Sequence, residues 1–281
     1  MLKGKKLGFI GGGNMAEAMV RGLITASFID PKNIIVADLV SEKLDKLRRD
    51  YKVRVTKDNR ELTDKSDVII LAVKPQVVKP VLTGIHDLVS GKKLVISVVA
   101  GVSIRTIEEF LQLDDSKKVG VVRTMPNTPA LVQSGVTALA PCKHVSKKDL
   151  QVAHRIFEAI GKTVDVNESH LDAVTGLSGS GPAYIYMIIE ALSDAGVKMG
   201  LSRHVANILT MQTVMGSAKL AIESGMHPGQ LKDMVTSPGG TTLSGLHALE
   251  AGGLRTTLMN AVEAATKRSA ELGREAEKNQ S

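Results

Sequence analysis

The stretch K-L-G-F-I-G-G-G-N-M-A, residues Lys6 to Ala16, decides the fold of this chain. Its apolar start predicts a short strand, and its three glycines then predict a tight turn. Small and apolar residues recur at helical spacing from Ala18 to Ile24, so a helix follows the turn. The spacing G-x-G-x-x-A at Gly11, Gly13 and Ala16 is typical of a dinucleotide-binding unit, in which the second glycine lets the backbone approach a pyrophosphate.

Short apolar runs continue downstream and alternate with helical spacing. This alternation is expected for parallel strands that are covered by helices on both faces. The predicted fold class is therefore α/β, with a Rossmann-type doubly wound parallel sheet in residues 1–166. Strands are expected at residues 6–10, 33–37, 53–56, 68–73, 94–99, 119–123, 135–140 and 163–166, with a helix over 150–160.

The character of the chain changes beyond His170, and an all-helical domain is predicted for residues 167–281. Its helices are expected at 182–195, 203–224, 228–235, 242–251 and 255–277. Methionines are concentrated here and are expected to fill irregular contacts between helices. The same small and apolar faces also suit a subunit interface. The methionines are Met187, Met199, Met211, Met215, Met226 and Met234.

Residues at the predicted carboxyl ends of strands are candidates for cofactor binding, because ligands of open α/β sheets bind at that edge. Asp38 ends the second strand, where a carboxylate accepts hydrogen bonds from the adenosine ribose and favours NAD over NADP. A helix cap or turn before Ser41 is the alternative role of Asp38. Ala72–Pro75 and Val98–Gly101 should line the cofactor path, with Lys74 facing either phosphate or solvent.

A second candidate site is the turn within Val235–Glu250, which reads V-T-S-P-G-G-T-T-L-S-G-L-H-A-L-E. Glycines and hydroxyl residues precede an apolar helical run, so the turn should present the N-terminus of a helix. Free N–H groups and the helix dipole make such a turn suited to a small anion. The alternative is an ordinary capped loop between two helices.

Composition narrows the function classes. The net charge is +7, but aromatic residues make up only 2% and there is no Trp, which disfavours a nucleic-acid binder that stacks bases. No apolar run is long enough for a membrane span, and the N-terminus has no signal-peptide core, so a cytoplasmic location is expected. The single Cys142 excludes an internal disulfide.

Metal and hydrolase chemistry find little support in the sequence. The seven histidines form no close pair with ligand spacing, so no metal site is predicted. Gly176–Gly181, which reads G-L-S-G-S-G, lacks the strand that precedes a nucleophilic serine and is expected to be a flexible joint before the helix from Pro182.

Five ordered blocks of sequence resemble the pyrroline-5-carboxylate reductase family. The resemblance runs from about Lys6 to about Ala270, and T-S-P-G-G-T-T is its most specific block. The blocks are F-I-G-G-G-N-M-A at 9–16, A-V-K-P at 72–75, M-P-N-T-P at 125–129, D-A-V-T-G-L-S-G-S-G-P-A-Y at 172–184, and H-P-G-Q-L-K-D with T-S-P-G-G-T-T at 227–242.

The resemblance implies reduction of L-1-pyrroline-5-carboxylate, a cyclic imine carboxylate, to L-proline with NAD(P)H, and a homodimer, often within a decamer. It places the cofactor on Gly11, Gly12, Gly13, Asn14, Asn59, Ala72, Val73, Lys74, Pro75, Val98, Val99 and Ala100. Met15, in the glycine turn, and Asp38, after the second strand, are added to the predicted cofactor site. It places the substrate on Glu168, Gly240, Thr241 and Thr242, with Thr242 and Ser237 as the catalytic candidates. Asp38 departs from the small hydroxyl residue of NADP-using members, so NAD and NADP both stay open.

Two other functions are weighed against this one. A β-hydroxyacid dehydrogenase shares the Rossmann-plus-helices layout but relies on a helical lysine, and no lysine lies between Val174 and Val197. A protein that binds NAD(P) without turnover is the other alternative, and the intact substrate turn argues against it.

Overall fold

The computed structural model describes residues 2, 4–113 and 117–278, which form two compact units. Unit 1 contains Met1–Gly179 together with Ala264–Ser281, and unit 2 contains Ser180–Glu263. The two units are defined by how the chain packs. They do not test the prediction that residues 167–281 bind the substrate and form the dimer.

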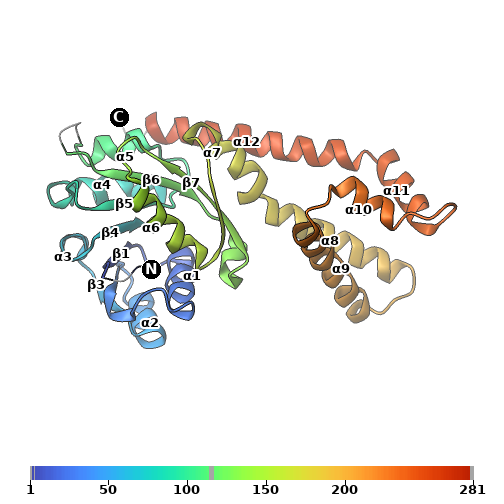
Figure 1. Cartoon of the computed structure of the whole chain (residues 1–281), viewed down its shortest axis with the longest axis horizontal. Helices are drawn as coiled ribbons and strands as arrows, with labels where there is room; N and C mark the ends of the chain where they lie inside the picture. The colour runs from blue at the N-terminus through green and yellow to red at the C-terminus, as the bar shows by residue number, and fades with distance from the viewer. Residues whose placement is uncertain (1, 3, 114–116, 279–281) are drawn as a thin grey trace. The chain divides into compact units, whose positions relative to one another are not determined.

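Unit 1 is built on one eight-stranded sheet in the order β3-β2-β1-β4-β5-β6-β7-β8 (Figure 1). Every predicted strand is present, with ends that differ by a few residues. The strands are β1 Leu7–Ile10, β2 Ile34–Ala37, β3 Arg54–Thr56, β4 Val68–Leu71, β5 Leu94–Ser97, β6 Gly120–Met125, β7 Gly135–Pro141 and β8 Gly161–Asp165.

Helices link these strands and cover both faces of the sheet. They are α1 Asn14–Thr25, α2 Ser41–Tyr51, α3 Asn59–Lys65, α4 Val78–Thr83, α5 Ile104–Phe110, α6 Lys147–Glu158 and α7 Leu171–Val174. Short 3₁₀ helices lie at Pro31–Asn33, Pro75–Val77, His86–Leu88, Thr128–Val132 and Glu168–His170.

The core explains why the central strands are uniformly apolar. All residues of β1, β2, β4 and β5 are buried. Successive residues face opposite sides, so Phe9 packs with α1 and α6 through Met19 and Phe157. Its neighbour Ile10 packs on the other face with α4, through Leu82. A sheet buried on both faces requires this continuous hydrophobic pattern.

Two strands, β7 and β8, run against the predicted direction. β6 and β7 pair antiparallel, whereas the other neighbouring pairs in the described part of the sheet are parallel. The link from Pro126 to Ser134 contains only a 3₁₀ helix. It is shorter than the dozen or more residues that a parallel crossover needs, so the chain returns in the opposite direction.

The expected joint at Gly176–Gly181 is ordered as helix. Thr175–Gly179 forms a π-helical turn that continues α7, and α8 then begins at Gly181 with Pro182 in its first turn. The boundary between the two compact units falls at the end of this π turn.

The end of the chain returns to unit 1. α12 spans Leu254–Lys278, and its residues from Ala264 onward belong to unit 1. Ser269 Oγ donates to Asp172 Oδ1 at 2.7 Å. A Cβ placed on Gly101 would lie 3.8 Å from the backbone of Gly273, so the helix packs closely over the end of β5.

Unit 2 is helical, as predicted, and has almost no core of its own. It contains α8 Gly181–Lys198, α9 Arg203–Ser224, α10 Pro228–Met234, α11 Thr241–Ala251 and the start of α12. Buried residues in its described part are Ser193, Ala206 and Thr210. The six methionines expected to fill helix contacts are instead exposed within the single chain, Met187 by 72% and Met199 by 81%.

Candidate active site

The glycine turn after β1 has the geometry that the sequence predicted. Gly11 has φ +102°, and its N–H donates to Ala37 O at 2.7 Å. A Cβ on Gly11 would lie 2.8 Å from the Ala72 carbonyl carbon and closer still to the oxygen. Because no real Cβ atom comes within 3.0 Å of such a neighbour, glycine is required for the turn to reach the end of β4.

Gly13 differs from Gly11 because the space around it is open. It is the N-cap residue of α1 at φ −77°, and no side chain caps the helix there. A Cβ on Gly13 would find no protein atom within 4 Å. Asn14 is exposed and Met15 half-buried beside it. An uncapped helix start with free space in front of it is a fitting place for a dinucleotide pyrophosphate.

Asp38 follows β2 and is tied to the glycine turn. Gly12 N–H donates to Asp38 Oδ2 at 2.8 Å, and Val40 N–H donates to Oδ1 at 2.9 Å. Lys43 Nζ lies 3.5 Å from Oδ2. Burial raises the pKa of this carboxyl, but the two backbone hydrogen bonds and the Lys43 charge outweigh it, so the pKa lies below its usual value.

The carboxyl ends of β4 and β5 continue the same edge. Ala72 N–H donates to Ile10 O at 2.8 Å, and Val98 N–H donates to Leu71 O at 3.0 Å. These two bonds extend the parallel ladder past the strand ends. Val99 is buried, whereas Lys74 and Ala100 are exposed and Val73, Pro75 and Asn59 are half-buried. Asn59 opens α3 directly after β3, so it also follows a carboxyl end.

Glu168 is held by groups that the sequence did not single out. Its Oε1 accepts from Ile104 N at 2.7 Å and from Arg123 Nη1 at 3.1 Å. The Arg123 side chain is only 14% exposed. Arg123 interrupts the apolar strand V-V-R-T-M, and a buried arginine in such a strand must have an acidic partner. The sequence alone therefore indicated that Arg123 has an acidic partner.

The substrate turn in unit 2 joins α10 to α11. Gly239 has φ +68°, and Gly240 N–H donates to Ser237 O at 3.0 Å. Gly240 is the N-cap of α11, and no side chain caps this helix. The first N–H groups of a helix have no intrahelical acceptor, so those of Thr241 and Thr242 are available to a ligand. Ser237 and Thr241 are exposed, and Thr242 is half-buried.

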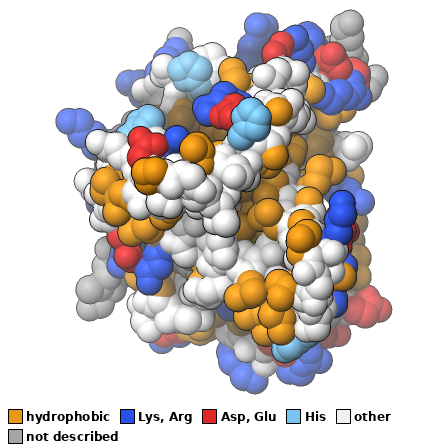
Figure 2. All heavy atoms as spheres, turned by 90° about the vertical axis from the view of Figure 1, so that its right-hand side faces the viewer, with side chains coloured by type: hydrophobic (Ala, Val, Ile, Leu, Met, Phe, Trp, Pro, Cys, Tyr) orange, Lys and Arg blue, Asp and Glu red, His pale blue; other side chains and the backbone are white. Residues whose placement is uncertain are grey.

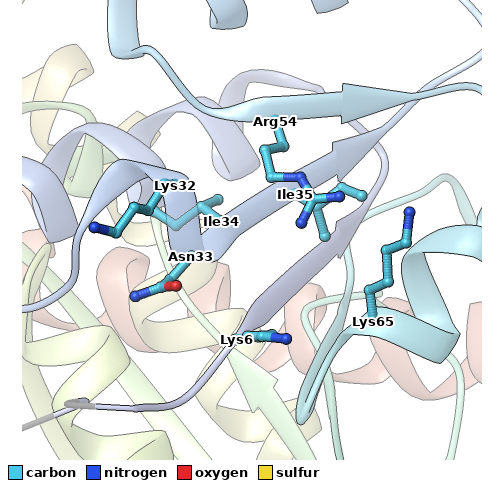
Figure 3. Close-up of a pocket in the computed structure, with 7 residues that line it drawn as sticks. All are labelled: Lys6, Lys32, Asn33, Ile34, Ile35, Arg54 and Lys65. Carbon is cyan, nitrogen blue, oxygen red and sulfur yellow. The ribbon is translucent and has the colours of Figure 1, made fainter.

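A separate pocket opens at the amino ends of β1, β2 and β3, on the edge opposite to the glycine turn (Figure 3). Two of its lysines are paired: Lys32 with Asp30 at 3.2 Å and Lys65 with Glu61 at 2.6 Å. Because cofactors of open α/β sheets bind at the carboxyl ends, this pocket is not the cofactor site. It is lined by Lys6, Lys32, Asn33, Ile34, Ile35, Arg54 and Lys65.

Metal ligands do not gather anywhere in the part of the chain that the structure describes. No group of three or more His, Cys, Asp or Glu residues there is placed to hold a metal ion. Its helices also include none that is long and apolar enough to cross a membrane.

Comparison with known families and proteins gives a consistent result. Residues 6–101 match the family described as NADP oxidoreductase, coenzyme F420-dependent, and residues 168–272 match pyrroline-5-carboxylate reductase dimerisation. A pyrroline-5-carboxylate reductase of Methanosarcina acetivorans is 47% identical over 97% of this chain and 100% of its own length.

Solved structures agree with the sequence matches. The pyrroline-5-carboxylate reductase of Coxiella burnetii has a TM-score of 0.90 at 41% identity, covering 95% of this chain and 98% of that one. The Plasmodium falciparum pyrroline carboxylate reductase with NADP bound has a TM-score of 0.84 at 36% identity, covering 96% and 99%. Full-length identity, the shared fold and the dimerisation match point the same way: this chain belongs to the pyrroline-5-carboxylate reductase family.

Proposed function

We propose that the Ser237–Thr242 turn receives the substrate of the reaction that this family catalyses, the reduction of L-1-pyrroline-5-carboxylate to L-proline with NAD(P)H. The observation that carries the proposal is the uncapped start of α11, where Gly240 supplies no side chain and hydroxyl residues lie on both sides. A helix N-terminus of this kind stabilises a carboxylate through N–H groups and the helix dipole.

The chemistry of the substrate matches the groups in the turn. The imine carries a carboxylate, which the N–H groups of Thr241 and Thr242 would bind. Thr242 Oγ would hydrogen-bond the ring nitrogen, and Ser237, whose carbonyl accepts from Gly240 N–H, closes the turn. Adding hydride to a C=N carbon depends on positioning and on a hydrogen-bonded nitrogen more than on a strong base. Glu168 remains a predicted substrate-binding residue.

The cofactor site is proposed at the carboxyl edge of the sheet. The glycine turn with Asn14 and Met15 would hold the pyrophosphate, and Asp38 and Asn59 would hold the adenosine end. Ala72–Pro75 and Val98–Ala100 would line the rest of the path. NAD(P)H bound there supplies the hydride. The open space at Gly13 supports this fit, because a side chain would fill the cradle.

The second unit is suited to join subunits. Figure 2 shows hydrophobic side chains gathered on the surface of this unit that faces the viewer. Ile208, Leu209 and Met211 on α9 are each more than half exposed in the single chain. Patches of this kind mark interaction sites. This region matches the family's dimerisation domain, and it makes the protein a homo-oligomer.

We propose a dimer that further assembles into a decamer in the cytoplasm. The mass measured by sedimentation equilibrium tests this assembly.

The experiment for the substrate site is a Thr242→Ala variant assayed for NAD(P)H oxidation with pyrroline-5-carboxylate. Loss of one placed polar contact should lower kcat/KM by roughly 10- to 1000-fold. Ser244→Ala is the matched control, because Ser244 is exposed on the same helix and should leave the rate unchanged. An unchanged rate in Thr242→Ala would remove this residue from the mechanism.

The same assay separates the two other functions considered from the sequence. Oxidation of a 3-hydroxy acid without reduction of the imine would indicate a β-hydroxyacid dehydrogenase. Cofactor binding with no turnover of the imine would indicate a protein that only binds NAD(P). The family membership supports neither alternative.

A further inference from the structure

The carboxylate of Asp38 has more hydrogen-bond donors around it than a ribose-binding residue needs. Gly12 N–H and Lys43 Nζ both approach Oδ2, and Val40 N–H occupies Oδ1. A carboxylate offers about four acceptor positions, so three donors leave about one for a ribose hydroxyl. The side chain is also only 12% exposed, which fixes it in this arrangement.

Lys43 is the donor that can move. It lies in the first turn of α2, its side chain is 48% exposed, and its ammonium is a point charge on a flexible stem. Lys46 lies nearly one turn further along the same helix, but Glu17 engages it at 2.6 Å. Tyr51 OH also donates to Glu17, so that carboxylate and Lys46 form a separate cluster.

The other groups near Asp38 include one that favours an anion, the start of α2, and one that opposes it, Glu42. Leu39, which follows Asp38, is 84% exposed and carries no charge. Val40 is the N-cap of α2 and supplies no capping side chain, so the start of this helix has free N–H groups. Glu42, in the first turn, is the opposing charge and is exposed to solvent.

We propose that Lys43 decides whether the enzyme accepts NADPH beside NADH. A 2′-phosphate on the adenosine ribose would lie next to the Asp38 carboxylate and would be repelled by it. An ammonium between the two anions offsets that repulsion and adds a charge-assisted hydrogen bond. With NADH, the same lysine stays on Asp38 and contributes little. The inference rests on the proposed cofactor site.

The test is a Lys43→Met variant, which keeps the stem of the side chain and removes its charge. Dissociation constants for NADP⁺ and NAD⁺ are measured by isothermal titration calorimetry, and again with 2′,5′-ADP and 5′-AMP. These fragments differ in the 2′-phosphate and need no turnover. The affinity for NADP⁺ and 2′,5′-ADP should fall about 10-fold, the scale of one charge-assisted contact, while NAD⁺ and 5′-AMP change less than about 3-fold.

The control is Lys46→Met, which removes the same charge from the same helix and should change both affinities by less than about 3-fold. Equal changes for NADP⁺ and NAD⁺ in Lys43→Met, or a larger loss for NAD⁺, would overturn the inference while leaving the cofactor site standing. If the unsubstituted protein bound neither NAD⁺ nor 5′-AMP, the proposed cofactor site itself would be wrong. Both variants are exposed substitutions, and matching urea midpoints would confirm that they are folded.

Discussion

The two glycines of the G-x-G motif should respond differently to the same substitution, because their surroundings differ. Gly11→Ala places a Cβ against the Ala72 carbonyl at a residue with φ +102°. Gly13→Ala places a Cβ in open space at φ −77°, an angle that alanine adopts readily. One change therefore strains the fold, and the other obstructs only what approaches the turn from outside.

The magnitudes follow from these geometries. For Gly11→Ala, a left-handed backbone costs about 1–2 kcal/mol and overpacking costs about 1–3 kcal/mol. The lower entropy of the unfolded alanine chain returns about 0.4–1 kcal/mol, so a net loss of roughly 1–5 kcal/mol is expected. For Gly13→Ala, the entropy gain and the weaker N-cap preference of alanine nearly cancel, within about 0.5 kcal/mol.

Urea unfolding and NADH binding, measured on the same samples, test both parts. Gly11→Ala should lower the unfolding midpoint, whereas Gly13→Ala should keep that of the unsubstituted protein and still bind NADH at least about 10-fold more weakly. The reasoning is refuted if Gly11→Ala is as stable as the parent protein. It is refuted equally if Gly13→Ala binds NADH normally, because the open space would then not be the pyrophosphate cradle.

Two further substitutions test the ion pairs of unit 1. Glu168→Ala leaves Arg123 without its carboxylate partner, so the free energy of unfolding should fall by about 1–3 kcal/mol. Glu168→Gln keeps an acceptor for Ile104 N–H, so it should lower the free energy of unfolding by less. Identical urea midpoints would deny Glu168 a structural role. Hydrogen bonds from Arg60 lower the pKa of Asp87 to about 2, below the value of about 3.9 in an unfolded chain. The ion pair therefore stabilises the fold above pH 4, and this stabilisation is lost as the pH falls through 2. Thermal midpoints of the parent and Asp87→Asn should therefore differ slightly at pH 5 and converge at pH 2, and a constant difference across this range would contradict the assignment.

The sequence was sufficient for the helices and strands and for the geometry of the glycine turn, because these depend on local patterns. The glycine turn, the apolar strands and Asp38 each carry a signal within a few residues. The direction of β7, and of β8 beside it, was missed, since it depends on the length of the link from Pro126 to Ser134 and not on the strands' own patterns. Lys43 was missed because an exposed lysine in a helix looks like any other until its distance to Asp38 is known.

For the helical domain, the sequence predicted the helices but not what their apolar faces pack against. Its helices were predicted closely, but the pattern of apolar residues does not distinguish a core from a subunit interface. Met211 is 52% exposed and Ile208 is 51% exposed, although their spacing is that of buried residues. Only the scarcity of buried residues in the described part of unit 2 indicates that its apolar faces pack against another subunit.

The return of α12 to unit 1 affects how the protein is made. Asp172 and Gly101 are covered by Ser269 and Gly273, which the ribosome adds only after the whole of unit 2. At about 5–20 residues per second, synthesis of residues 180–263 delays this closure by roughly 4–17 s. During that interval the nascent first unit lacks the helix that covers Asp172 and Gly101.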